Sequence, residues 1–369
     1  MQKIPASLLR GGTSKGLYFI AGDLPTEIET RDRVLLAAMG SPDARQIDGI
    51  GGAHPLTSKV AIVSASSHPD ADVDYLFLQV VVDKALVSDG QNCGNILAGV
   101  GPFAIESGLV DIAGTTTDVR VRMLNTGACA TLRVNTPDNT VCYEGNAQID
   151  GVPGTASPVT IDFLDVAGSS CGRLFPTGNA VDTFSETEVT CIDNGMPVVL
   201  INASEMGIQG TESPSELEAN HALKSKLEAI RLEAGRKMNL GDVTNKTVPK
   251  MTLVSLPLAG GTLSTRTFIP HRVHDAIGVL GSVSVATASM VEGTVANKLL
   301  VDKPSFTSSV QTLSASIRVE HPTGEFVVEM DVSNTTSLTD FKVNRAALLR
   351  TARLLMQGSV FIPDAAFNA

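Results

Sequence analysis

The sequence predicts an α+β protein built from two similar domains, each with antiparallel strands wrapped around one buried helix. Apolar, glycine-rich runs begin at Cys93 and at Gly278, and each is long enough for one helix without a charged face. Around both runs lie short segments of alternating apolar residues, separated by turn-forming residues. A chain of 369 residues is long for a single core, so we expect two domains, 1–184 and 185–369.

The order of segments in the first half supports this division. A hairpin is predicted for residues 5–20, where the glycines of the turn supply backbone angles that other residues avoid. A short helix with Thr30 as its candidate cap precedes a β-branched strand that begins at Lys59. The segments that follow are predicted as a strand over 74–83, a helix from Cys93 to about Gly108, and strands over 119–124, 130–135 and 159–163.

The second half repeats this order. Its corresponding segments are 197–202, a longer helix from Ser213 to about Lys237, a strand within 248–255, the apolar run 278–288, and 316–324. In this repeat Lys250 corresponds to Lys59. Two β-rich domains that face each other leave a cleft, and ligand sites form preferentially in such clefts. We therefore expect an active site in the interdomain cleft.

Composition limits the classes of partner. The formal net charge of −11 argues against nucleic acid, whose phosphates require a basic surface, but it allows a small anionic substrate in a site with its own local field. No apolar run approaches the length of a membrane helix and no signal peptide pattern precedes the first strand, so we expect a cytoplasmic protein with no membrane partner.

The sequence also predicts that the protein works without a metal or a cofactor. Its five cysteines are widely spaced and form no CxxC pair, which is typical of reduced thiols rather than of zinc ligands. The histidines show no metal-binding spacing, and no GxGxxG or phosphate-loop motif occurs.

Lys59 and Cys93 are the candidate catalytic residues. A lysine can serve as a base near neutral pH when burial or a nearby cation depresses its pKa. A cysteine at a helix start faces unpaired N–H groups and the positive end of the helix dipole, which favour a thiolate or a bound anion. The structural alternatives are a solvated lysine at a strand end and a small cysteine that only packs.

The predicted substrate-binding residues surround these two. Amide groups flank Cys93, and hydroxyl groups occupy the first hairpin turn and the position before Lys59, although turn hydroxyls can also satisfy their own backbone. At the second central helix no cysteine occurs, and Ser282 or Val283 is expected in the place of Cys93. The complete predicted set is Arg10, Thr13, Ser14, Ser58, Asn92, Gly94, Asn95, Ser282 and Val283.

Four segments together resemble one family of isomerases. They are Leu-Arg-Gly-Gly-Thr-Ser-Lys-Gly (9–16), Leu-Thr-Ser-Lys-Val-Ala (56–61), Gln-Asn-Cys-Gly-Asn (91–95) and Phe-Pro-Thr-Gly-Asn (175–179). The family is that of the cofactor-independent isomerases, which includes methylaconitate isomerase and 4-oxalomesaconate tautomerase, and the resemblance extends over essentially the whole chain. Segments 41–51 and 91–104 look closest to the oxalomesaconate branch.

The resemblance implies a fold related to diaminopimelate epimerase and a pair of site residues. The family's Thr-Ser-Lys and Asn-Cys-Gly motifs fall on Lys59 and Cys93. Diaminopimelate epimerase uses one cysteine from each domain. In this chain the first-domain motif has Cys93, but the second domain has no cysteine in the corresponding place, so a two-thiol racemase is not expected.

The implied activity is a 1,3-proton shift on a tricarboxylate-like keto acid, with 4-oxalomesaconate from aromatic-acid breakdown as the expected substrate. Three alternatives stay open: an isomerase for methylaconitate or aconitate, a racemase or epimerase with Lys250 as its second base, and a non-catalytic carboxylate-binding protein. The expected partner is a small di- or tricarboxylate, and the chain is a possible homodimer.

Overall fold

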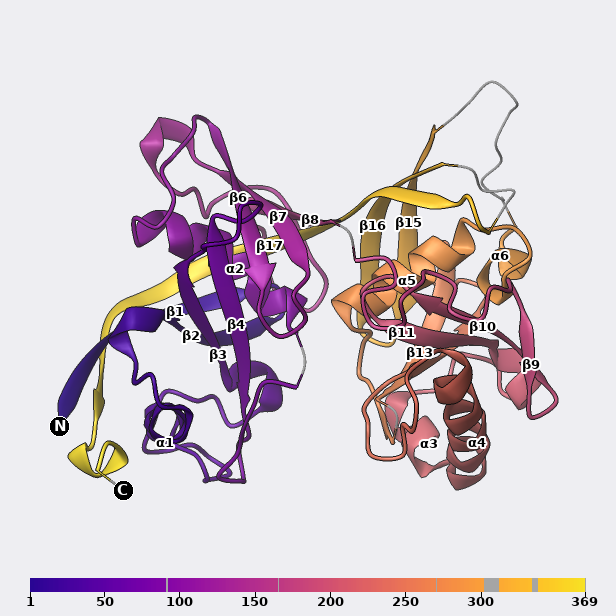
Figure 1. Ribbon diagram of the computed structural model, residues 1–369, viewed down its shortest axis with the longest axis horizontal. Coiled ribbons are helices and arrows are strands. Elements are labelled where there is room, and N and C mark those ends of the chain that lie inside the picture. Colours follow the sequence, from indigo (N-terminus) through magenta and orange to yellow (C-terminus); the bar gives the residue numbers. More distant parts are fainter. Residues whose placement is uncertain (91, 165, 270, 302–311, 334–337, 369) are drawn as a thin grey trace. The chain divides into compact units, whose positions relative to one another are not determined.

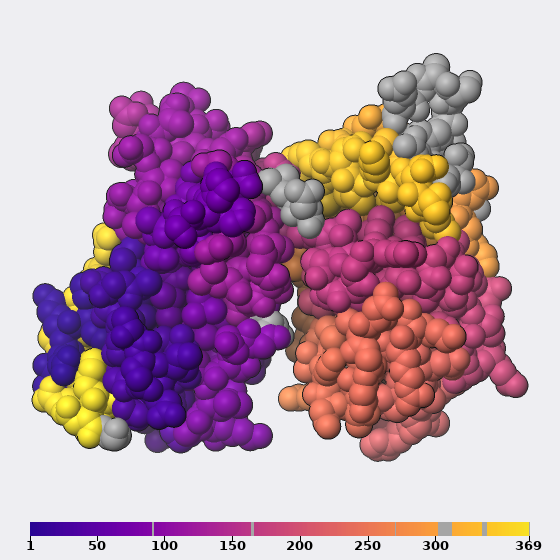
Figure 2. Space-filling view, viewed as in Figure 1, coloured from indigo at the N-terminus to yellow at the C-terminus, as the bar shows by residue number. Residues whose placement is uncertain are grey.

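The structure is a computed structural model that describes residues 1–90, 92–164, 166–269, 271–301, 312–333 and 338–368 (Figure 1). Its contacts form two compact units, Met1–Asp162 with Leu349–Ala369, and Phe163–Leu348. The predicted domains 1–184 and 185–369 differ from this division in two places: residues 163–184 belong to the second unit, and the end of the chain returns to the first. There the last strand pairs with the first, and the C-terminal residues in yellow lie against the N-terminal residues in indigo (Figure 2).

The first unit consists of one sheet and two principal helices. Its elements are β1 (Gln2–Gly11), β2 (Ser14–Ile20), α1 (Ile28–Met39), β3 (Lys59–Ala65), β4 (Val73–Val80), β5 (Val87–Ser88), α2 (Gly94–Glu106), β6 (Thr116–Met123), β7 (Cys129–Asn135), most of β8 (Pro158–Leu164) and the second part of β17 (Lys342–Ile362). Strands β17, β1 and β2 are antiparallel neighbours, as are β3 with β4 and β6 with β7.

The sheet is mixed rather than purely antiparallel, which corrects the prediction. Strand β2 runs parallel to β3, and β4 runs parallel to β6. Parallel neighbours require a long crossover connection, and α1 and α2 lie within the two connections concerned. The predicted central helix is confirmed, because α2 contacts β1, β2, β3, β4, β6 and β7 and is buried from Ile96 to Ile105 (Figure 1).

The two faces of this sheet have different coverings. Leu17 and Phe19 of β2 belong to an apolar cluster with Val34 and Leu35 of α1. Since side chains alternate along a strand, the intervening Tyr18 points to the other face, and its Oη donates a 2.6 Å hydrogen bond to the Ile96 carbonyl of α2. We call these two faces the α1 face and the α2 face.

The second unit repeats this arrangement, as predicted. Its elements are β9 (Asp182–Phe184), β10 (Thr187–Asp193), β11 (Pro197–Asn202), α3 (Pro214–Ala219), α4 (His221–Lys237), β12 (Lys250–Ser255), β13 (Leu263–Ile269), β14 (Arg272–Val273), α5 (Val279–Ser289), α6 (Val295–Leu299), β15 (Thr312–His321), β16 (Gly324–Ser333) and the first part of β17. Hairpin β10–β11 is followed by parallel β11–β12, antiparallel β12–β13, parallel β13–β15 and antiparallel β15–β16.

Helix α5 is the counterpart of α2 and is buried along its whole length. The single helix predicted from Ser213 to Lys237 is instead two helices. They separate at Asn220, whose side chain accepts from the Leu223 N–H and caps α4.

The contact between α2 and the sheet leaves no room for a larger residue at Gly99. A Cβ at Gly99 would lie 2.4 Å from Tyr18 Oη. We expect Gly99→Ala to lower the free energy of unfolding by about 1–3 kcal/mol, although alanine otherwise favours helices. Urea unfolding followed by circular dichroism measures this change.

Gly22→Ala is the matched control, because a Cβ there meets nothing within 4 Å. Its expected change is within about 0.5 kcal/mol. Equal stability of the two variants would contradict the tight packing of α2 on Tyr18.

Candidate active site

Lys59 is the first residue of β3, and its side chain is held on the α2 face. It is only 6% exposed. Its Nζ donates a 2.7 Å hydrogen bond to Gln79 Oε1 and lies 4.9 Å from the centre of the Phe77 ring. Lys59 pairs with Gln79 in the register of β3 and β4, so the two side chains leave the sheet on the same face.

Gln79 is itself fixed by the backbone around it. Its Nε2 donates to the carbonyl oxygens of Pro55 and Ser58 at 3.1 and 2.8 Å, and more weakly to that of Val80 at 3.4 Å. These acceptors determine which end of the amide is the nitrogen, so the oxygen must face Lys59. Gln79 therefore acts as an oriented acceptor that sets the position of the lysine amine.

The start of α2 provides unpaired donors close to the cysteine. Cys93 is the residue that precedes the helix, and no side chain caps the first turn. The first helical bond runs from the Leu97 N–H to the Cys93 carbonyl, which leaves the N–H groups of Gly94, Asn95 and Ile96 without a helical acceptor. Such groups can bind a carboxylate or stabilise an enolate oxygen.

One row of side chains on β4 connects the lysine to the cysteine. Tyr75, Phe77 and Gln79 alternate along β4 and so lie on the α2 face, in a row about 13 Å long. Gln79 and Phe77 contact Lys59, and Tyr75 Oη donates to the Cys93 carbonyl at 3.3 Å. The structure thus brings both predicted catalytic residues to one face of the first unit.

The two tyrosines that hold α2 remain protonated. Burial raises the pKa of Tyr75 well above its ordinary value, and the charges of Cys93 and Tyr18 are smaller causes in the same direction. Burial likewise raises the pKa of Tyr18, with Cys93 as the next cause. Both hydroxyls can therefore donate to helix carbonyls throughout the physiological pH range.

The first hairpin turn also reaches the start of α2. Asn95 Nδ2 donates to Thr13 Oγ1 at 3.1 Å, and the Thr13 N–H donates to Asn95 Oδ1 at 3.4 Å. Gly12, at φ +50°, lies so close to Asn95 that a Cβ would be 2.1 Å from Oδ1. The predicted association of Thr13 with Asn95 is thus direct.

Two polar atoms near these residues have no partner within the described part of the chain. They are Ser14 Oγ, on a residue 2% exposed, and Asn92 Oδ1. Asn92 Nδ2 donates to Thr126 Oγ1 at 2.7 Å, which fixes the orientation of that side chain. Ser14 Oγ can donate to a ligand oxygen, whereas Asn92 Oδ1 can only accept.

Ser58 is not available to a ligand, contrary to the prediction. It is fully buried, its Oγ donates to the Val80 carbonyl at 2.8 Å, and it accepts from Gln46 Nε2 at 2.7 Å. As the neighbour of Lys59 it points to the opposite face of the sheet. Its role is to hold the segment before β3.

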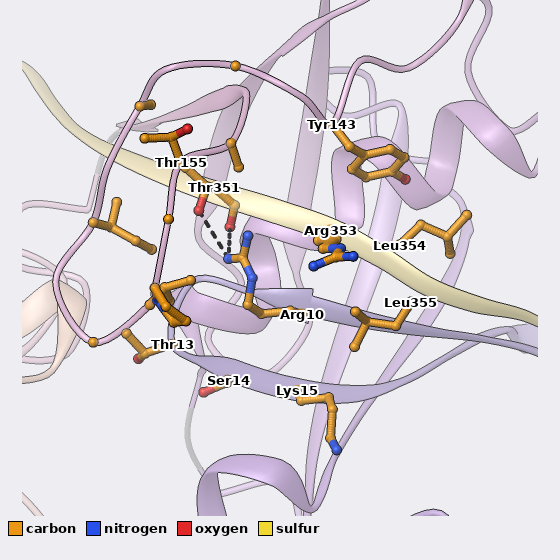
Figure 3. Close-up of a pocket in the computed structure, with 18 of the residues that line it drawn as sticks. Arg10, Thr13, Ser14, Lys15, Tyr143, Thr155, Thr351, Arg353, Leu354 and Leu355 are labelled. Carbon is orange, nitrogen blue, oxygen red and sulfur yellow. Dashed lines mark hydrogen bonds between the residues drawn. The ribbon is translucent and has the colours of Figure 1, made fainter.

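Arg10 lines one cavity with Thr13 and Ser14 (Figure 3), with which the prediction grouped it, but its side chain leaves the sheet on the other face from Lys59. Side chains alternate along β1, and Ile4 and Ala6 belong to the apolar cluster on the α1 face. Arg10 is an even number of residues further along, so its side chain leaves the strand on the same face. Its Nη1 donates to the carbonyls of Gly12 and Thr351, both at 2.9 Å. Arg10 is therefore on the face opposite to Lys59 and braces the hairpin turn.

In the second unit the residue that precedes the central helix is Gly278. The predicted correspondence of Cys93 to Ser282 or Val283 is wrong by about one helical turn. Both residues are fully buried within α5, and Ser282 Oγ donates to the Val279 carbonyl. Neither side chain offers a polar group to a ligand.

Lys250 is the true counterpart of Lys59, as predicted. It is the first residue of β12. The next residue, Met251, belongs to the apolar cluster around α4, so the Lys250 side chain leaves the sheet on the face opposite to that cluster. Burial, and next the charge of Arg231, lower the pKa of Lys250 to about 8. Its Nζ donates to the Thr247 carbonyl at 2.7 Å rather than to an oriented side-chain acceptor.

Sequence reasoning did not identify Gln79, Tyr75 or Tyr18. The signal that could have found them is the alternation of Tyr75, Phe77 and Gln79 in a strand predicted next to Lys59.

Within the ranges that the structure describes, no three His, Cys, Asp or Glu side chains are grouped to hold a metal ion. None of the helices described there is long and apolar enough to cross a membrane.

Comparison with known proteins identifies the family. The model of the PrpF protein family matches residues 1–363. A 4-oxalomesaconate tautomerase of Pseudomonas putida is 58% identical over 360 residues, which cover 98% of this chain and 96% of that protein. A (4E)-oxalomesaconate Delta-isomerase of Novosphingobium sp. is 56% identical over 362 residues, which cover 98% of each chain.

A crystal structure of methylitaconate-delta-isomerase has a TM-score of 0.85 at 36% identity and covers 99% of this chain and 97% of that one. The resemblance drawn from the Lys59 and Cys93 motifs is confirmed. The chain is a member of the PrpF protein family and an isomerase.

Proposed function

We propose that the chain catalyses a 1,3-proton shift on 4-oxalomesaconate, in the breakdown of aromatic acids. The names of the relatives at 56–58% identity favour this substrate. The observation that supports the chemistry best is the buried amine of Lys59, held 2.7 Å from Gln79 Oε1 on the α2 face. The expected position of the site between the two units is part of this proposal.

In the proposed reaction unprotonated Lys59 removes a proton from the carbon next to the carbonyl. The electron pair of the broken C–H bond spreads over the conjugated system and places negative charge on oxygen. The N–H groups of Gly94, Asn95 and Ile96 stabilise this charge. A proton then returns two carbons away or to the oxygen, so that the product has the composition of the substrate.

The returning proton has two candidate donors. If the transfer stays on one face of the substrate, the ammonium of Lys59 delivers the proton that it removed. If the faces differ, the Cys93 thiol delivers it, and solvent then takes the proton from the Lys59 ammonium and returns one to the Cys93 thiolate. In both cases the substrate carboxylates are held by Ser14 Oγ, Thr13 and the free N–H groups at the start of α2, with Asn92 as an acceptor for a protonated group.

Two alternative substrates or reactions are each favoured by a specific observation. The fold and 36% identity shared with a methylitaconate-delta-isomerase favour allylic isomerisation of a related acid. The position of Lys250, with its pKa of about 8, favours an epimerase-type reaction with two bases. The first alternative changes only the substrate, while the second requires Lys250.

Methionine substitution of the two corresponding lysines distinguishes these schemes. We expect Lys59→Met to lower kcat at least about 100-fold, because it removes the base. The matched control, Lys250→Met, is expected to keep kcat within about threefold. Proton NMR in D2O follows both isomerisation and deuterium incorporation for each candidate acid.

Each outcome has a distinct meaning. Full activity of Lys59→Met would contradict the proposed base. Equal losses in both variants, together with inversion at a carbon, would support the two-base epimerase instead.

The role of Gln79 as a positioning residue is tested by Gln79→Glu, which keeps an acceptor oxygen but adds a negative charge beside Lys59. A carboxylate favours the ammonium form of a neighbouring lysine. We expect Gln79→Glu to lower kcat at least about tenfold, while KM stays within about threefold, because the carboxylate engages the amine that must accept the proton. A residue with only a structural role would change the unfolding midpoint as well, and an unchanged kcat would contradict this assignment.

A further inference from the structure

The side chain of Gln46 lies buried beside the segment that leads into β3. The residue is only 1% exposed, and the two ends of its amide bind three different parts of the chain. Nε2 donates to Ser41 Oγ at 3.0 Å and to Ser58 Oγ at 2.7 Å. Oε1 accepts from the Ala53 N–H at 2.9 Å. One amide therefore holds both ends of segment 53–58.

The partners of Gln46 determine the orientation of its amide. A backbone N–H can only donate, so the atom that faces Ala53 must be the oxygen. The Ser58 hydroxyl donates its proton to the Val80 carbonyl at 2.8 Å, so it can only accept from Gln46. A buried polar network in which each group has a partner rigidifies its surroundings. Segment 53–58 is thus held in one conformation.

The loop before β3 is folded closely around the Gln46 side chain. A Cβ at Gly51 would lie 2.2 Å from Gln46 Oε1. Gln46 and Ala53 have φ values of +47° and +58°, in the left-handed region that is unfavourable for residues with a Cβ. Strained backbone of this kind persists only where the surrounding structure fixes it, and it is common at functional sites.

The backbone that Gln46 holds carries the acceptors that orient Gln79. Gln79 Nε2 donates to the carbonyls of Pro55 and Ser58, at 3.1 and 2.8 Å. Gln79 Oε1 in turn accepts from Lys59 Nζ at 2.7 Å. A continuous series of hydrogen bonds and short backbone segments therefore connects the Gln46 amide to the lysine amine.

We propose that Gln46 is a positioning residue of the isomerase, which acts on Lys59 through segment 53–58 and Gln79. The inference rests on the proposed function, in which Lys59 is the base. Without the Gln46 amide the segment loses a hydrogen bond at each end, so its carbonyls no longer fix Gln79. A catalytic group displaced by about 1 Å can lose about 100-fold in rate. Because the displaced group moves the proton, kcat is affected more than KM.

Methionine substitutions test this connection, because methionine is as long as glutamine but has no amide. The variants are Gln46→Met, Gln79→Met and the combination of the two, all in the full-length protein. Rates are measured by proton NMR on the acid that the wild type isomerises, at a temperature at which circular dichroism shows each variant to be folded. If Gln46→Met does not fold, Ser58→Ala replaces it with the same expectation, because it removes the hydroxyl that Gln46 binds.

Thr117→Val is the matched control, because it also removes a buried polar group from the first unit. Thr117 is 1% exposed, and its Oγ1 makes a 2.9 Å hydrogen bond with Thr136 Oγ1. It precedes Val121, whose partner on the parallel strand is Val73, the first residue of β4. Gln79 is near the end of β4, so Thr117 is far from it along the strands.

We expect Gln46→Met to lower kcat at least about tenfold, while KM stays within about threefold. In the Gln79→Met background the same substitution should change kcat by no more than about twofold, because the connection to the amine is already broken. Thr117→Val should keep kcat within about twofold in both backgrounds, although the lost hydrogen bond lowers its unfolding midpoint.

Two results would overturn the proposal. The first is an unchanged kcat in Gln46→Met. The second is an equal loss of kcat in both backgrounds, because Gln46 would then act independently of Gln79. Failure of the proposed function has a different sign, which is full activity of Lys59→Met. An inactive Lys59→Met beside a fully active Gln46→Met contradicts this inference alone.

Discussion

The attachment of α2 to the sheet by two tyrosine hydroxyls is the constraint on which the site depends. Tyr18 Oη donates to the Ile96 carbonyl and Tyr75 Oη to the Cys93 carbonyl, so the first turn of the helix is fixed over the strands. Burial keeps both hydroxyls protonated and able to donate. Gly99 is needed at this contact, since a Cβ there would strike Tyr18. With the helix start fixed in this way, Cys93 and the first N–H groups of α2 lie on the face of the sheet that also holds Lys59, and among the described residues these N–H groups have no helical acceptor.

The alternation of side chains then divides the sheet of the first unit between two environments. The α2 face carries Lys59, Gln79 and the tyrosines, and its polar groups suit proton transfer and an oxyanion. The α1 face carries an apolar cluster under α1. Arg10 and Ser14 are four residues apart in the sequence but lie on opposite faces, because the hairpin turn intervenes and each strand alternates from there. Both residues nevertheless line one cavity at the end of the hairpin, together with Thr13.

Much of the fold and part of the site could be predicted from local patterns. The apolar runs predict the two central helices, and the repeated order of segments predicts the correspondence of Lys250 to Lys59, which the strand pairing confirms. The run 278–288 agrees with α5, but the counterpart of Cys93 was placed about one turn too late, because Gly278 has no side-chain cap to mark the helix start. Gln79 was missed because its importance comes from a cross-strand register. The membership of 349–369 in the first unit was missed because the pairing of β17 with β1 joins the two ends of the chain. Such long-range pairings leave no local signal.

The most direct test of the account is a crystal structure with a bound tricarboxylate that cannot be isomerised. The central claim is that proton transfer takes place on the α2 face, between Lys59 and the start of α2. The account predicts that Lys59 Nζ lies within about 3.5 Å of the carbon that loses the proton and that a carboxylate or carbonyl oxygen accepts from the N–H groups of Gly94 to Ile96. A bound ligand that leaves Lys59 engaged by Gln79 alone and makes no contact with these N–H groups would contradict it.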